Sequence, residues 1–476
     1  MHNKTLGSNS ISADAGNRKY WRTPEERDEP IAAAESAHGE FGPDVLNNAL
    51  PANVVSRRGF LGVLGASAAL ATVGCDNHQR TIVPYTKRPA EIIPGVANYY
   101  ASTFPEGKRS YPVLVKTREG RPIHIMGNDE HPRFKGKTST RAIADISALY
   151  DPDRLRSPRF EQRPIAWSDV EKALVAALTT AKRDGTGVLL LTGASGSPSQ
   201  DALLAQLKVS VPTLDVIHWE PAVSDSARAG CKAAFGVDLE LQPKLGEADV
   251  IVSFGCDFLN GEDPVAIGEF SAKRNPEPPG RAMNRLWVFE GALSLTGANA
   301  DERFPMRPSQ LPQLAFALAR DLHIKAGIEL PAEVNVPAVP ADVVSRLGID
   351  AAVWSQLIAD LARSRSRAVV LCGDELSPEA HVAVHLLNSM LKSVAIETRP
   401  GLPLASLQDL QRLVTSMLAG RYSMAVLWNI NPVYAYPDPE QWNAAFAKVA
   451  TRVWIGSVAD ESAAQCQWVL PANHWL

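Results

Sequence analysis

His381 and His385 stand four residues apart, the spacing with which one helix face offers two imidazoles to a metal ion. Zinc proteases with this spacing carry a glutamate directly after the first histidine, where this chain has Val382. The pair therefore favours an ordinary helix face over a metal site.

The cysteines are dispersed and form no CxxC pair. An iron–sulfur cluster needs four thiolates, and an odd, scattered set also argues against a disulfide framework. Cys256 follows an apolar run that predicts a strand, but no histidine lies near it in the sequence to activate it as a nucleophile. A half-buried, inert thiol is the favoured interpretation. The five cysteines are Cys75, Cys231, Cys256, Cys372 and Cys466.

A glycine-rich turn separates an apolar run, 187–193, from a helical pattern at 200–209. A strand, a glycine turn and a helix in this order can bind phosphate at the helix N-terminus. Gly193 and Gly196 lack both the full GxGxxG spacing and the P-loop lysine. The pattern therefore favours an ordinary βα turn over a dinucleotide site.

One motif concerns export. Arg57 and Arg58 are followed by Phe60, Leu61 and small or apolar residues up to Gly74. This layout is typical of a twin-arginine signal, which exports folded proteins. The predicted location is the periplasmic face of the inner membrane.

The signal segment, 56–75, ends at Cys75 after a small residue, as in lipoprotein signals, although Thr72 stands where they prefer leucine. Cys75 is therefore a lipidation candidate that would tether the protein to the membrane, and the alternative is an uncut signal with a free thiol. The polar residues 1–55 predict a largely disordered leader. The alternative is a partner-binding tail anchored by Trp21.

Composition indicates a globular protein of two or three domains. The chain has 476 residues, 45% of them hydrophobic, and a net charge of -4, which gives no basic field for nucleic acid. The apolar segment 59–74 is shorter than the roughly 20 residues that span a bilayer.

The elements that must position these residues follow from periodicity. Alternating runs at 111–117 and 122–128 predict a β-hairpin in a β-rich first domain, 81–160. Apolar strands then alternate with helical patterns, which predicts an α/β fold of open, mostly parallel sheets flanked by helices. A proline-rich connector at 330–340 divides this part into an α/β domain, 161–330, and a second, 341–476, that is expected to be incomplete at its C-terminus.

The hairpin carries a resemblance to a known family. Glu119-Gly120-Arg121-Pro122-Ile123, Gly127-Asn128, His131-Pro132 and the later Leu149-Tyr150-Asp151-Pro152 are similar to the first domain of molybdopterin oxidoreductases. Three further features make the family resemblance more specific: the leader with Tyr20-Trp21-Arg22, the internal export signal and the segment from Ile82 to Gly95. They resemble the molybdopterin-oxidoreductase-like B subunits of alternative complex III, a quinol-oxidising membrane complex.

The departures from that family concern its cofactors. No cysteine lies between Cys75 and Cys231, so this part of the chain cannot hold the iron–sulfur cluster that active members bind. The segment from Lys137 to Arg141 stands where active members carry a Cys-Pro-Lys-Gly turn. The resemblance implies that the turns near the family's cofactor are vestigial here. These turns contain Gly193, Gly196, Gly255, Cys256, Asn429 and Asn431.

The function implied by the resemblance is a scaffold that binds no metal or other cofactor and has no catalytic residues of its own. It would support electron transfer from menaquinol in a respiratory complex. Iron–sulfur clusters are expected in a further C-terminal part or in a partner. The implied partners are a multihaem cytochrome c, a polyferredoxin-like subunit and integral membrane quinol-binding subunits. The alternatives are an active bis-molybdopterin-guanine-dinucleotide oxidoreductase and a stand-alone exported binding protein.

Overall fold

The computed structural model describes residue 89 and residues 92–261, 263–277, 282–331, 334 and 336–476. Pro89–Leu476 form a compact unit distinct from Met1–Arg88. The leader, the export signal (Arg57, Arg58, Phe60, Leu61) and Cys75 lie outside the described residues and stay predictions. No helix in the described part of the chain is long and apolar enough to cross a membrane.

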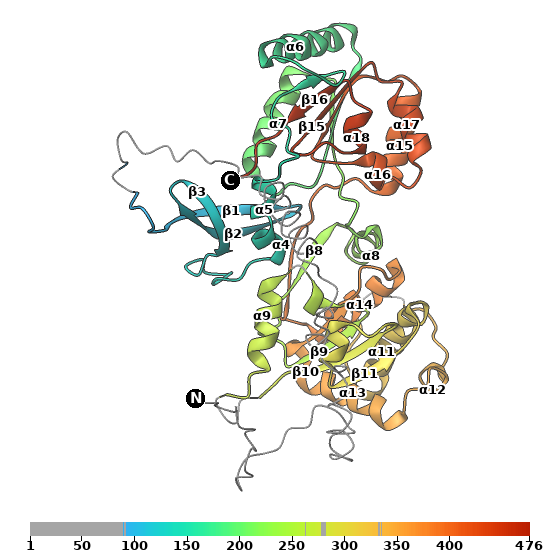
Figure 1. The fold of residues 1–476 in the computed structure, drawn as a ribbon. Helices are drawn as coiled ribbons and strands as arrows, with labels where there is room; N and C mark the ends of the chain where they lie inside the picture. Colours follow the sequence, from blue (N-terminus) through green and yellow to red (C-terminus); the bar gives the residue numbers. More distant parts are fainter. Residues whose placement is uncertain (1–88, 90–91, 262, 278–281, 332–333, 335) are drawn as a thin grey trace, which may run out of the picture. The chain divides into compact units, whose positions relative to one another are not determined.

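The first domain is built on a three-stranded antiparallel sheet, which Figure 1 shows in blue and teal. Its predicted hairpin is present, with a tight turn in which Glu119 and Gly120 have φ of +51° and +77°. A further strand that the sequence analysis did not predict pairs with the hairpin. The elements are β1 (Asn98–Glu106), β2 (Arg109–Arg118), β3 (Arg121–Gly127), α4 (Thr140–Ala144) and α5 (Ile146–Leu149).

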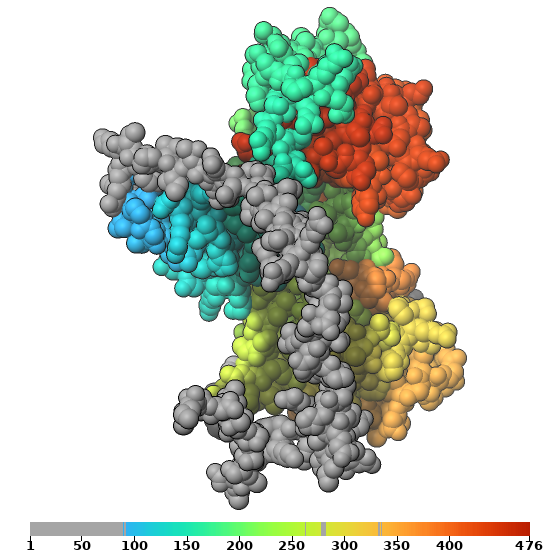
Figure 2. Space-filling view, viewed as in Figure 1, coloured from blue at the N-terminus to red at the C-terminus, as the bar shows by residue number. Residues whose placement is uncertain are grey.

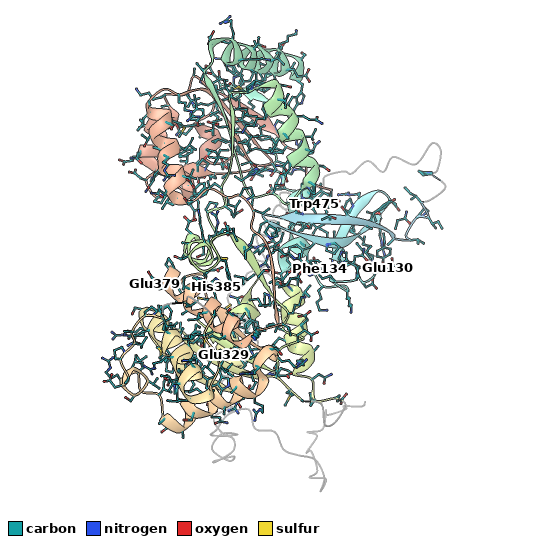
Figure 3. All side chains as sticks on the ribbon, turned by 180° about the vertical axis from the view of Figure 1, so that it is seen from behind. Glu130, Phe134, Glu329, Glu379, His385 and Trp475 are labelled. Carbon is teal, nitrogen blue, oxygen red and sulfur yellow. The ribbon has the colours of Figure 1, made fainter. Side chains whose placement is uncertain are left out.

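The core of this domain includes Phe104, Tyr111 and Ile125, and Trp475 packs against it. Figure 3 labels Phe134 and Trp475 beside this sheet. Trp475 donates to the Asp145 carboxylate, and His474 Nε2 lies 2.9 Å from the same carboxylate. The last residues of the chain are therefore bound to the first domain.

A second sheet has four parallel strands in the order β11-β10-β9-β12. Three of its strands, β9, β10 and β12, are almost entirely buried, as expected for a sheet covered on both faces, and β11 at the edge is only partly buried. Val252 faces a core with α11, α13 and α14, whereas Ile251 faces α9. The elements are β9 (Val250–Phe254), α9 (Pro264–Lys273), β10 (Arg285–Glu290), α10 (Leu295–Ala298), β11 (Glu302–Pro305), α11 (Leu311–Ala326), α12 (Val343–Arg346), α13 (Ala351–Ser364), β12 (Ala368–Cys372) and α14 (Pro378–Leu391).

A third sheet has the order β5-β4-β16-β15-β14-β6-β7. Leu190 faces α6 and α7, and Leu191 faces α15 and α17, so helices cover both faces (Figure 1). In the space-filling view α6 lies at the surface (Figure 2), where Val175 is exposed. The elements are β4 (Arg159–Phe160), β5 (Arg163–Pro164), α6 (Trp167–Asp184), β6 (Gly187–Thr192), α7 (Pro198–Ser210), β7 (Leu214–His218), α15 (Leu407–Leu418), β14 (Tyr422–Trp428), α16 (Pro432–Ala435), α17 (Pro439–Phe446), β15 (Thr451–Gly456), α18 (Glu461–Ala464) and β16 (Trp468–Pro471).

Two further strands, β8 (Leu239–Pro243) and β13 (Ile396–Pro400), pair antiparallel. Helix α8 (Asp225–Phe235) packs closely on α14, because a Cβ at Gly230 would lie 2.8 Å from the carbonyl oxygen of Pro378. Only glycine permits this approach without a shift of the two helices.

The sheets do not follow the predicted division at 330–340. β12 lies beyond that connector but pairs with β9, and β14 pairs with β6. Each large sheet is therefore assembled from two separated stretches of chain. Local periodicity cannot reveal this arrangement, because it reports what a segment forms and not which strand it joins.

Candidate functional site

A cavity of about 940 Å³ lies at the carboxyl end of the four-stranded sheet. Its walls contain residues that follow β9, β10 and β12, together with parts of β8, α8, α14 and the turn between β1 and β2. Ligands of α/β proteins bind at this edge of a parallel sheet, because the connecting loops converge there. The cavity is therefore the candidate site.

Two glycines bring the loops after β9 and β12 together. The amide of Gly373 donates to the carbonyl oxygen of Phe254 at 2.8 Å, and Gly255 has a φ of +67°. The Glu375 carboxylate lies against both glycines, since Cβ atoms built at Gly373 and Gly255 would lie 2.6 Å and 2.8 Å from its Oε1 atom. A carboxylate thus covers the backbone where the two loops meet.

Cys256 and Cys372 also belong to these loops. Burial, followed by the charges of Asp374 and Glu375, raises the pKa of the Cys256 thiol to about 12. Burial likewise raises the pKa of Cys372. Both thiols are therefore protonated at neutral pH, and a protonated thiol is not an activated nucleophile.

The cavity wall on α14 contains His381 and His385, whose side chains are only 4% and 5% exposed. Burial lowers the pKa of both, that of His385 to about 4, so both imidazoles are neutral at pH 7. The Nε2 atom of each has no hydrogen-bond partner among the described residues. Within the described part of the chain, no three His, Cys, Asp or Glu side chains are close enough to hold a metal ion.

The turn between β1 and β2 also reaches the cavity. Lys108 forms an ion pair with Glu240 at 3.2 Å, and Glu106 forms one with Arg141 at 3.2 Å. The sequence analysis missed this turn because it did not predict β1. A signal was present in Pro105-Glu106-Gly107, a turn-forming sequence directly before the predicted hairpin.

The lining of the cavity is acidic. Nine carboxylate side chains line it, against four lysine or arginine side chains. The field in the cavity therefore favours cations and disfavours phosphate groups.

Four of the predicted turn residues lie elsewhere, at the carboxyl edge of the seven-stranded sheet. Gly193 follows β6 and Asn429 follows the adjacent β14, and a Cβ at Gly193 would lie 3.8 Å from the Asn429 carbonyl oxygen. Asn431 donates to Glu461 at 2.6 Å and accepts from the Ser462 hydroxyl at 2.7 Å. A Cβ at Gly196 would lie 3.4 Å from the Lys108 carbonyl oxygen. The structure thus separates these residues from Gly255 and Cys256, which line the cavity.

No family model matches the chain. It is 28% identical to the menaquinone reductase, molybdopterin-binding-like subunit, of Nitratidesulfovibrio vulgaris (strain Hildenborough), over an alignment that covers 89% of this chain and 66% of the relative. This finding confirms the resemblance predicted from the hairpin and leader.

Among solved structures, acetylene hydratase from Pelobacter acetylenicus, a molybdopterin-family enzyme, matches with a TM-score of 0.57 and 14% identity. The match covers 79% of this chain and 61% of that enzyme. The chain has the molybdopterin-oxidoreductase-like fold. It spans less than two thirds of either protein.

The molybdopterin-oxidoreductase-like fold raises the question of whether these residues fit a molybdopterin dinucleotide. The pyrophosphate of such a dinucleotide binds at turns where glycines allow the backbone amides to come close to the phosphate oxygens. At Gly255 and Gly373 the Glu375 carboxylate occupies that space, whereas a Cβ at Gly196 would make only an ordinary contact, 3.4 Å, with the Lys108 carbonyl oxygen. The residues at the Gly255 and Gly373 turns, as they are arranged here, therefore do not fit a pyrophosphate.

Proposed function

We propose that this chain is a cofactor-free, molybdopterin-binding-like subunit of a membrane-bound, menaquinone-linked respiratory complex. The observation that carries the cofactor-free part is the Glu375 carboxylate, which lies against Gly255 and Gly373 and fills the space at these two turns. The similarity to a menaquinone reductase subunit supports the link to quinone.

The name of the relative bears on the direction of electron flow. The sequence analysis expected menaquinol oxidation, as in alternative complex III, whereas the relative is named for the reduction of menaquinone. We propose only that the complex exchanges electrons with menaquinone. An assay of the purified complex with menaquinol and with menaquinone analogues would determine the direction.

In this proposal the chain supplies structure and a docking surface, and other parts carry the electrons. Iron–sulfur clusters reside in a further part of the protein or in a partner, because the first domain has no cysteine between Cys75 and Cys231. The partners are a multihaem cytochrome c, a polyferredoxin-like subunit and integral membrane subunits. Export by the twin-arginine signal brings the chain to the periplasmic face of the inner membrane.

Metal and pterin analysis of the purified complex tests the cofactor-free role. Inductively coupled plasma mass spectrometry should find no stoichiometric molybdenum or tungsten, and oxidation of the denatured complex should release no fluorescent pterin. Stoichiometric metal with pterin would contradict the proposal and favour the active oxidoreductase.

Affinity purification from solubilised membranes tests the assembly. A tag on the chain should recover a multihaem cytochrome and an integral membrane subunit in constant ratio. Recovery of the chain alone from gently solubilised membranes would favour the stand-alone exported binding protein.

A further inference from the structure

We propose that the tip of the β2–β3 hairpin, residues 116–124, binds the surface of an anionic lipid bilayer. Lysine and arginine side chains of this hairpin tip would contact the lipid phosphates, and the exposed tyrosine and isoleucine side chains around them would enter the headgroup layer. The inference rests on the proposed function in one respect, the membrane-bound location of the protein. It adds the surface through which this chain itself meets the membrane.

The first argument is the register of the hairpin (Figure 1). Strands β2 and β3 pair Arg118 directly with Arg121, and the pair before the turn residues joins Lys116 to His124. Like charges on directly opposite positions of two strands destabilise a sheet. Among the described residues neither arginine forms an ion pair, and neither does Lys116 or the turn residue Glu119. The hairpin tip therefore has a positive charge that is not balanced locally, and an anionic surface would stabilise it.

The second argument is a group of exposed aromatic and apolar side chains at the same end of the sheet. Tyr99 of β1 lies directly opposite Lys116, and Ile123 belongs to β3 within the tip itself. The Arg121 guanidinium carbon lies 5.2 Å from the centre of the Tyr150 ring. Tyr99, Ile123 and Tyr150 are between 45% and 52% exposed. Such side chains beside cations suit the boundary between lipid headgroups and acyl chains.

The third argument is the distribution of charge along the chain. The described part of the first domain, residues 92–160, has 12 lysine and arginine residues against 8 aspartate and glutamate residues. Residues 161–476 have 26 against 35. An anionic bilayer attracts the first domain and repels the rest, so this asymmetry favours an orientation with the first domain toward the membrane.

The chain that precedes the first domain also leads to this end of the sheet. Strand β1 begins at Asn98, which lies opposite Thr117 beside the hairpin tip. Cys75, the lipidation candidate, precedes Asn98 by 23 positions, a distance of at most about 80 Å for an extended chain. A tether at Cys75 would therefore keep this end of the first domain within reach of the bilayer.

Sedimentation with lipid vesicles tests the inference. The purified full chain is mixed with vesicles of phosphatidylcholine alone, or of phosphatidylcholine and phosphatidylglycerol in equal parts. Every variant carries Cys75→Ala, so that no acyl chain can hold the protein on the vesicles. The chain should bind the phosphatidylglycerol vesicles more tightly, and this binding should weaken as the salt concentration rises from about 0.05 to 0.5 M.

Two variants separate the charge from the apolar contact. Arg118→Gln combined with Arg121→Gln removes two positive charges from the hairpin tip and should weaken binding to anionic vesicles about tenfold or more. Ile123→Ser keeps the charge but removes an apolar side chain, and should weaken the same binding about threefold or more. A partner that recognised only positive charge would not respond to Ile123→Ser.

Lys172→Gln combined with Lys208→Gln is the matched control. Both lysines are exposed, on α6 and α7, and form no ion pair in the described part of the chain, so this variant loses the same charge from a different surface. It should leave vesicle binding unchanged, and thermal denaturation should show that all variants are folded. The inference is overturned if the chain does not prefer anionic vesicles, if the arginine and lysine variants weaken binding equally, or if Ile123→Ser has no effect.

The affinity purification described above distinguishes a bilayer from an acidic protein partner. An arginine variant that binds vesicles normally but no longer recovers a subunit overturns the inference and assigns the hairpin tip to that subunit. Failure of vesicle binding leaves the proposed function standing, because integral membrane subunits can hold the complex in the membrane. Stoichiometric molybdenum with pterin overturns the proposed function but not the vesicle result.

Discussion

The four-stranded sheet and the seven-stranded sheet both end in turns that contain glycine, but the surroundings of these turns differ. We call the residues that follow β9, β10 and β12 the open edge. They line the cavity, and among the residues that the structure describes Asp374 and Glu375 have no cationic partner. We call the residues that follow β6 and β14 the bonded edge, because contacts within the chain hold them in place. Asn431 binds Glu461 and Ser462, and the Lys108 carbonyl oxygen lies near Gly196.

This difference shows that glycine- and asparagine-rich turns do not by themselves make a binding site. At the bonded edge the polar groups already have partners, so a ligand would have to displace them at a cost in free energy. At the open edge Asp374 and Glu375 are exposed and line the cavity instead of being bonded within the chain. The cavity-lining residues, rather than the turns, therefore distinguish the two edges.

Alanine in place of one glycine at each edge, Gly373 and Gly193, compares how tightly the two turns are packed. Gly373→Ala should lower the free energy of unfolding by about 3 kcal/mol, because the added methyl group would overlap the Glu375 carboxylate and the loop after β9. Gly193→Ala at the bonded edge should cost less than about 0.5 kcal/mol, because its nearest neighbour is 3.8 Å away. Urea denaturation measures both, and equal losses would refute the distinction.

The buried histidines should make stability depend on pH. Burial holds the pKa of His385 near 4 in the folded protein, below its ordinary value of 6.5, so the unfolded chain binds more protons between these values. Stability is therefore complete above about pH 6.5 and falls toward pH 4, by about 1.4 kcal/mol per pH unit for each such histidine. Urea denaturation between pH 7 and 5 should show a loss of about 2 kcal/mol from His385. His385→Phe should reduce this slope, and an unchanged slope would contradict the assignment.

At the bonded edge, Asn431→Ala should lower the free energy of unfolding by about 1 kcal/mol, because Glu461 and Ser462 lose a partner and α16 loses its N-cap. Asn299→Ala, which removes one exposed bond to the Leu295 carbonyl oxygen, is the control and should cost less. Thermal denaturation of both variants makes the comparison. A neutral Asn431→Ala would mean that this edge is not held by these contacts.

The ion pair at the cavity rim should matter least. Lys108→Met removes the partner of Glu240, but both side chains are about one-third exposed. Solvent screening then limits the loss of stability to about 0.5 kcal/mol. A loss comparable to that of Gly373→Ala in the same urea assay would show that this turn contributes more to the fold than the ion pair explains.

Several elements could be predicted because their signal is local. The apolar run 248–255 became β9, the run 187–193 became β6, and the alternating runs around Glu119-Gly120 became the hairpin. Strand β1 could not be predicted in this way, because Tyr99, Tyr100 and Ala101 are all exposed and show no alternation. Its pairing with β2 stabilises it instead.

The sequence by itself determined the α/β class, the family resemblance and the absence of cysteines from the first domain, because these depend on residue types and spacing along the chain. Only the tertiary structure decided that β12 joins β9, that β14 joins β6, and that the six predicted turn residues divide between two sheet edges. It also placed the Glu375 carboxylate against Gly255, 120 positions earlier in the sequence. The physical reason is that strand pairing and charge proximity depend on contacts between distant segments, which no local pattern records.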